Sequence, residues 1–146
     1  MEYLSIGDFC MSSYILKKLD LKTKSYPFDW IFSYPHIIIE CLETNFESFL
    51  KDEYLETISP SECFHKKYNL RLFNHHNPKE NEAHKKYFER CIKRFNTMKL
   101  SNDRKCVFRT VQYHDINNEL KENKQYYQYL KQYINNFEFI VILIIS

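Results

Sequence analysis

Apolar and polar residues follow one another along the chain in patterns that predict helices and strands in turn. In some stretches apolar residues recur every three or four positions, which is typical of amphipathic helices, while short apolar runs between them are typical of strands. Because the predicted helices and strands alternate along the chain, we expect an α/β fold. It would be a Rossmann-like layered domain with a mostly parallel sheet and flanking helices. The expected helices cover about 10–19, 35–49, 80–98 and 115–134, and the expected strands cover 3–6, 68–73, 107–113 and 137–145.

The first and last of these helices carry apolar residues that we expect to face the core. The inner face of the first helix would consist of Met11, Tyr14, Ile15 and Leu19. The inner face of the last helix would consist of Leu120, Tyr127, Leu130 and Ile134. Asp115 stands directly before the last helix, where an aspartate caps the first turn well.

The last predicted strand is apolar on both faces, because residues 140–145 contain no polar side chain. Such a strand is typical of the centre of a parallel sheet, where helices cover both faces. Only Ser146 follows it in the sequence. We therefore expect either a chain shortened at its C-terminus or a partner that covers this strand, which would allow self-association through it.

The amino-acid composition limits the number of domains, the partners and the location that we expect for this protein. We expect one domain over residues 1–146, since 44% of the residues are apolar and can fill a core. The 21 basic and 19 acidic residues nearly cancel, so we expect neither nucleic acid nor a membrane as a partner. The five cysteines are odd in number and widely spaced, which favours a reducing, cytoplasmic location and no structural zinc. We expect no metal and no cofactor.

Cys10 lies where the first strand gives way to the first helix. The start of a helix favours the thiolate, which is the nucleophilic form of cysteine. Asp8 is expected to cap this helix, and its charge would oppose that effect. The alternative is a structural cysteine packed beneath the helix, which is a common role for this residue.

Histidines that could serve as a general base follow a predicted strand. His75 and His76 come directly after the 68–73 segment, so either imidazole could meet a thiol at the edge of the sheet. His65, His84 and His114 are also available, and the sequence does not decide among them.

Three arginines could bind an anionic ligand. Arg90 and Arg94 are four residues apart and therefore share one face of a helix. Arg109 lies inside a predicted strand, where its burial would require a partner. Guanidinium groups bind carboxylates and phosphates through paired hydrogen bonds. More often, however, a pair such as Arg90 and Arg94 is a solvated helix face, and the neighbouring Glu89 and Lys93 favour that interpretation.

Four segments of the chain carry a recognisable set of motifs. They are Leu4–Cys10, Ser25–Ile31 with its Pro-Phe-Asp-Trp sequence, Leu72–Pro78, and Tyr87–Phe95. Together they resemble the family of putative papain-like cysteine peptidases, which occurs in bacteria and large DNA viruses. The first two segments are similar to the N-terminal signature of that family, the third to its histidine-containing segment, and the fourth to its Tyr-x-x-Arg-x-Ile-x-Arg-Phe element. The resemblance spans nearly the whole chain.

This resemblance implies a thiol-dependent hydrolase that acts on a peptide or small-molecule substrate. Cys10 would be the nucleophile, His75 the base and Asp29 the acid that orients the base. It also implies a location in the bacterial cytoplasm or, for a viral protein, in the host cytoplasm or virion. One departure from the family is His76, since an acidic residue is usual at that position.

Two other functions stay open on the sequence alone. The chain could be a Rossmann-like binding or transferase domain for a nucleotide or nucleotide-sugar, with Arg90, Arg94 and Arg109 as ligands. It could also be an inactive interaction protein. Gly7 is the only glycine, so a glycine-rich dinucleotide loop is excluded.

Overall fold

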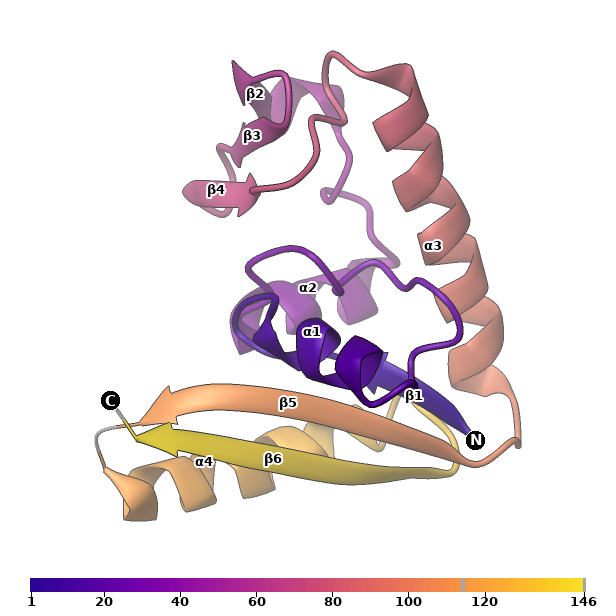
Figure 1. Ribbon diagram of the computed structural model, residues 1–146, viewed down its shortest axis with the longest axis vertical. Coiled ribbons are helices and arrows are strands. Elements are labelled where there is room, and N and C mark those ends of the chain that lie inside the picture. Colours follow the sequence, from indigo (N-terminus) through magenta and orange to yellow (C-terminus); the bar gives the residue numbers. More distant parts are fainter. Residues whose placement is uncertain (114, 146) are drawn as a thin grey trace.

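The computed structural model describes residues 1–113 and 115–145, which form a mixed α/β structure with two three-stranded sheets (Figure 1). The alternation of strands and helices predicted from the sequence is confirmed. The elements are β1 (Glu2–Ser5), α1 (Met11–Lys18), α2 (Pro35–Thr44), the 3-10 turn Asp52–Tyr54, β2 (Leu55–Ser59), β3 (Glu62–His65), β4 (Leu70–Phe73), α3 (Glu82–Leu100), β5 (Lys105–Tyr113), α4 (Ile116–Leu130) and β6 (Phe137–Ile145).

The larger sheet is parallel, with the strand order β1-β5-β6. β5 lies in the middle and is buried from Lys105 to Val111. α4 connects β5 to β6, which gives the strand–helix–strand crossover expected of parallel neighbours. The parallel sheet is therefore confirmed, while three strands are too few to distinguish a Rossmann-like sheet from other parallel sheets.

The prediction that the last strand is central is wrong. In the described part of the chain β6 pairs only with β5, and Ile140 and Ile142 are 43% and 39% exposed. They lie on one face of an edge strand, whereas Phe139 on the other face packs against Tyr126 of α4. The sequence misleads here because isoleucine suits a strand whether or not its outer face is covered.

Helices cover both faces of β5. Successive strand residues point to opposite faces, and Thr110 contacts Ser12 of α1 while Arg109 contacts Asn123 of α4. The buried residues of α1 are Ser12, Ser13 and Leu16. The predicted inner face of this helix is wrong, because Met11, Tyr14 and Leu19 are 37%, 49% and 60% exposed.

α4 begins as predicted, and Leu130 and Ile134, two of the four residues expected to pack inward, are buried. The side chain of Asp115 accepts hydrogen bonds from the backbone N–H groups of Asn117 and Asn118 and thus caps the helix. Leu120, expected to be inside, is 60% exposed, and the polar Asn123 is buried in its place. That exchange follows from the buried arginine on β5, which needs a polar neighbour.

The smaller sheet is antiparallel, in the order β2-β3-β4, and lies at the opposite end of the molecule from the parallel sheet (Figure 1). β4 confirms the strand predicted at 68–73, but the two strands before it were not predicted. β2 and β3 are short, and three of the five residues of β2 are exposed, so they lack an apolar signal.

An aromatic cluster fills the core between α2, α3 and β4. Its rings meet mostly edge to face, which is the favoured arrangement of aromatic pairs, and their centroids are 4.9–6.3 Å apart. α3 extends from the end of the molecule that holds the antiparallel sheet to the end that holds the parallel sheet (Figure 1). The cluster consists of Phe28, Phe46, Phe49, Phe73, Phe88 and Phe95.

No helix in the described residues is both long and apolar enough to cross a membrane.

Candidate functional site

Cys10 is the residue that precedes the first turn of α1. Its backbone carbonyl accepts a hydrogen bond from the N–H of Tyr14 at 3.0 Å, and its side chain does not cap the helix. The Cys10 side chain is partly exposed at the carboxyl end of β1. In α/β proteins this edge of a parallel sheet is where ligands bind. The predicted position of Cys10 just before the first helix is therefore confirmed.

A hydrogen-bonded cluster beneath this turn holds it in place. Ser12 Oγ lies 2.8 Å from Thr110 Oγ1 and also accepts a hydrogen bond from the Thr110 backbone N–H at 2.8 Å. The Ser33 hydroxyl donates to the carbonyl of Gly7. A side chain at position 7 would place its Cβ 2.0 Å from Ser12 Oγ. The sole glycine of the chain is thus required by close packing rather than by a special backbone conformation.

Asp8, two residues before Cys10, forms an ion pair with Arg109 of β5. Asp8 Oδ1 lies 2.8 Å from Arg109 Nη2, and the two side chains are 18% and 6% exposed. Arg109 also donates a hydrogen bond to Asn123 and lies over the ring of Tyr126. The expectation that Asp8 caps α1 is wrong, because its carboxylate interacts with Arg109 instead. The expectation that a buried Arg109 needs a partner is confirmed.

Asp29, the predicted orienting acid, is buried, with only 2% of its surface exposed. Its carboxylate lies 2.7 Å from Lys22 Nζ and accepts a hydrogen bond from the Tyr26 N–H at 2.9 Å. Burial raises the pKa of the Asp29 carboxyl, and the charge of Lys22 opposes that rise. In the structure this carboxylate therefore holds the 22–29 segment together.

His75, the predicted base, lies on the loop after β4 and is exposed. Its ring meets the ring of Trp30 edge to face at 6.1 Å, and Lys17 Nζ lies 6.0 Å from the same indole. Lys17 is in the last turn of α1, about 10 Å along the helix axis from Cys10. Among residues 1–113 and 115–145, no hydrogen bond or ion pair joins the side chains of Cys10, Asp29 and His75.

The other predicted histidines differ in their surroundings. His76 stacks on Tyr87 at 5.0 Å, and burial together with nearby His84 lowers the pKa of His76 to about 4. His65 is fully buried and interacts with the carbonyl of Ser48 at 2.8 Å. Burial lowers the pKa of His65 as well. His114 lies outside the described residues.

His36 is a histidine that the sequence analysis did not consider. It is exposed in the first turn of α2, and its ring stacks on Tyr34 with the centroids 6.2 Å apart. The hydrogen bond from Ser33 to Gly7 ties the start of this segment to the turn before Cys10. A serine followed by an X-Pro helix start was visible in the sequence, but no sequence signal joined it to Gly7.

The three arginines do not form one site. Arg109 is buried beside Asp8, whereas Arg90 and Arg94 lie on α3 along a groove that Arg109 does not line. Within the described residues, no group of three or more histidine, cysteine, aspartate or glutamate side chains is arranged to hold a metal ion.

Comparison with known proteins identifies the family. The family model described as "putative papain-like cysteine peptidase" matches residues 1–146. No curated protein and no solved structure matches the chain. Because the match covers the entire chain, the protein belongs to this papain-like cysteine peptidase family.

Proposed function

We propose that this protein is a thiol-dependent hydrolase in which Cys10 is the nucleophile. The observation that carries the proposal is the position of Cys10, partly exposed before α1 at the carboxyl edge of the parallel sheet. Nucleophiles of α/β hydrolases occupy this kind of strand–turn–helix position. The family description names the same class of chemistry.

The other four cysteines support this choice by their burial. Cys41, Cys63, Cys91 and Cys106 are all buried, and burial raises the pKa of each thiol, that of Cys41 to about 12. A thiol reacts as its thiolate, so these four positions disfavour nucleophilic chemistry. All five cysteines are unpaired, which fits the proposed cytoplasmic location.

The proposed reaction cleaves a peptide, amide or ester bond in two steps. A histidine removes the Cys10 proton, and the sulfur attacks the carbonyl carbon to form a tetrahedral intermediate. The intermediate collapses to a thioester as the amine or alcohol leaves with the proton from the histidine. Water then attacks the thioester, releases the carboxylic acid and restores the thiol. Backbone N–H groups of residues 9–11 would stabilise the negative oxygen.

Two histidines are proposed as the base. His75 is the residue that the family resemblance assigns, with Asp29 as its orienting acid. His36 is the second candidate, because the hydrogen bond from Ser33 to Gly7 brings its segment to the turn before Cys10. Both histidines are exposed.

Turnover of p-nitrophenyl acetate tests this proposal. The wild-type protein should release p-nitrophenol with an initial burst equal to one acetyl group per chain, and mass spectrometry should find that group on Cys10. Cys10→Ser should abolish the burst. Loss of the true base should lower the rate by about 10²–10⁴-fold, so His75→Ala and His36→Ala decide between the two rings. Equal bursts from wild type and Cys10→Ser would contradict the proposal.

A further inference from the structure

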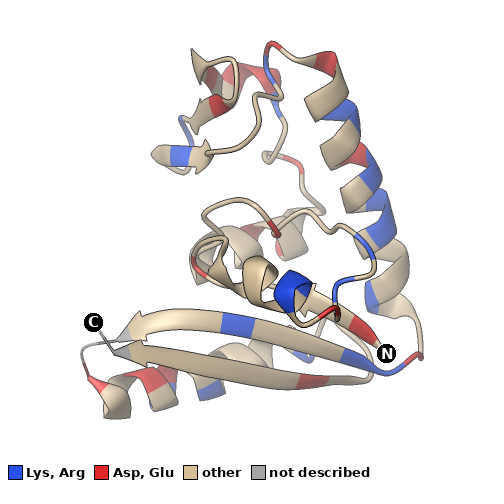
Figure 2. Cartoon of the chain, in the orientation of Figure 1, with Lys and Arg blue, Asp and Glu red and all other residues tan. Residues whose placement is uncertain are grey.

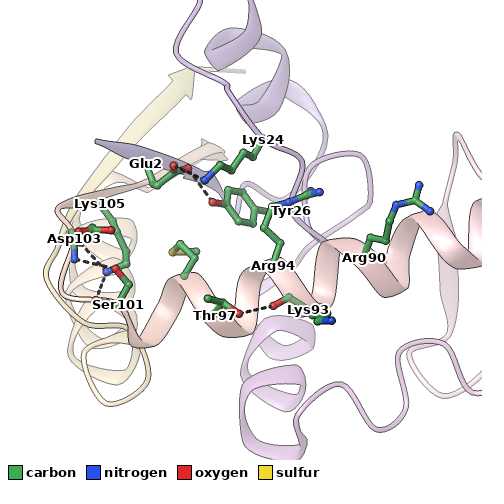
Figure 3. A pocket seen from close by; sticks show the side chains of 11 residues that line it. Glu2, Lys24, Tyr26, Arg90, Lys93, Arg94, Thr97, Ser101, Asp103 and Lys105 are labelled. Atoms are coloured by element: carbon green, nitrogen blue, oxygen red, sulfur yellow. Dashed lines mark hydrogen bonds and ion pairs between the residues drawn. The ribbon is translucent and has the colours of Figure 1, made fainter.

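A groove separate from Cys10 lies between α3 and the segment that leads into Tyr26. Its volume is about 500 Å³, within the range of pockets that take small molecules. Arg94 projects from α3 toward Tyr26, and Arg90 projects from the same side of the helix (Figure 3). Lys93 and Lys24 also line it.

A second hollow of about 450 Å³ shares Lys24 and Arg94 with the first. It adds Lys17 and Lys22 to the cations and Trp30 as an aromatic wall. Lys and Arg positions recur along α3 and in the nearby loop (Figure 2). Lys24 and Arg94 therefore line two hollows, and both hollows have several basic residues in their lining.

Carboxylates near the groove balance only some of these cations, among them Lys22, which pairs with the buried Asp29 at 2.7 Å. Glu2 pairs with Lys24 at 3.1 Å, but Lys24 is 53% exposed, and an exposed pair of this kind is weak enough for a ligand to replace it. Arg90 and Lys93 are exposed, and their side chains have no ion pair or hydrogen bond with any described residue. Asp103 is the other acidic residue of the lining.

Arg94 is held in position by the protein itself. Its Nη1 donates a hydrogen bond to the Ser25 carbonyl at 2.5 Å, and no carboxylate pairs with it in the described part of the chain. The remaining N–H groups of a guanidinium fixed in this way are oriented for a planar pair of hydrogen bonds. Lys105 also lines the groove, but its Nζ already donates to three carbonyls.

We propose that this groove binds a phosphate-bearing small molecule, with Arg94 and Lys24 holding one phosphate and Arg90 and Lys93 extending the positive surface along α3. Phosphate fits better than a single carboxylate, because a doubly charged group better matches Arg90, Lys93 and Arg94, which have no carboxylate partner among the described residues. The site does not depend on thiol chemistry, since Cys10 lines neither hollow.

Isothermal titration calorimetry with inorganic pyrophosphate tests the proposal at physiological ionic strength. Pyrophosphate should bind at one site per chain. Arg90→Glu combined with Lys93→Glu should weaken binding at least tenfold. The matched control is Lys121→Glu with Lys124→Glu, which makes the same change of charge on exposed residues of α4 outside the groove and should leave binding within twofold.

Further binding measurements define the ligand and the site. ATP should compete with pyrophosphate, Arg94→Lys should weaken binding several-fold although its charge is kept, and Cys10→Ser should bind as the wild type does. The proposal is overturned if pyrophosphate gives no binding, if both double variants weaken binding equally, or if a tetraglutamate peptide binds more tightly than pyrophosphate. Circular dichroism of each variant confirms that it is folded.

Discussion

Asp8 and Arg109 are 101 residues apart in the sequence and form an ion pair of 2.8 Å that joins the turn before Cys10 to the central strand of the parallel sheet. Arg109 is 6% exposed, so its charge depends on protein partners, which are Asp8 and Asn123. This pair, together with the contact of Ser12 with Thr110, fixes the segment that presents the thiol.

Removing the charge of Asp8 should destabilise the protein. Asp8→Asn would leave the Arg109 guanidinium buried without a counter-charge, and breaking one partner of such a pair costs about 3 kcal/mol. Urea unfolding at pH 7 measures the change in the free energy of unfolding. Glu138→Gln is the control, since its pair with Arg104 is exposed and its loss should have little effect. Equal losses of unfolding free energy in the two variants would show that the Asp8–Arg109 ion pair stabilises the protein no more than an exposed pair does.

Gly7→Ala should also destabilise the protein, because the added methyl group would overlap Ser12 Oγ and approach Thr110 Oγ1 to 3.1 Å. Overpacking of this kind costs about 1–3 kcal/mol. Thermal unfolding should show the loss. Combining it with Ser12→Ala removes the overlapping hydroxyl and should recover part of the stability. Failure of the second substitution to recover any stability would contradict the proposed cause.

Stability should fall in acid through His76, whose pKa is lowered to about 4 by burial. Between pH 6.5 and 4 the unfolded chain binds a proton at this residue and the folded chain does not. Stability is therefore fully present above pH 6.5 and decreases as the pH falls toward 4, by about 2 kcal/mol after allowance for partial burial. His76→Phe keeps the stacking on Tyr87 and removes the titration.

The measurement for His76 is urea unfolding of both proteins at pH 7 and at pH 4.5. The wild type should lose more stability than His76→Phe over this interval. A variant that loses as much as the wild type would assign the acid sensitivity to other groups, of which His65 is one, because burial lowers its pKa as well.

The regular elements of the fold followed from local patterns, and the contacts between distant segments did not. Strong apolar periodicity predicted α3, and the isoleucine-rich run predicted β6. The short strands β2 and β3 were missed because most of their residues are polar or exposed. The edge position of β6 depends on strand order, which apolar content does not encode.

In the candidate site, too, the features with a local sequence signal were predicted and the contacts between distant segments were not. A strand, a glycine turn and a helix start placed Cys10 correctly, because all three are local signals. The partner of Asp8 could not be predicted, since a carboxylate before a helix suits a cap equally well. A buried arginine on β5 was the one hint that a distant acid was needed. The nearness of Ser33 to Gly7 had no signal at all.

Labelling of the native protein with iodoacetamide at pH 7.5, followed by peptide mass spectrometry, tests the assignment of Cys10 most directly. We predict that Cys10 is carbamidomethylated first and at least tenfold faster than the four buried cysteines, and that labelling abolishes the burst with p-nitrophenyl acetate. Unlabelled Cys10 alongside modified Cys63 or Cys106, or full activity after Cys10 is modified, would contradict it.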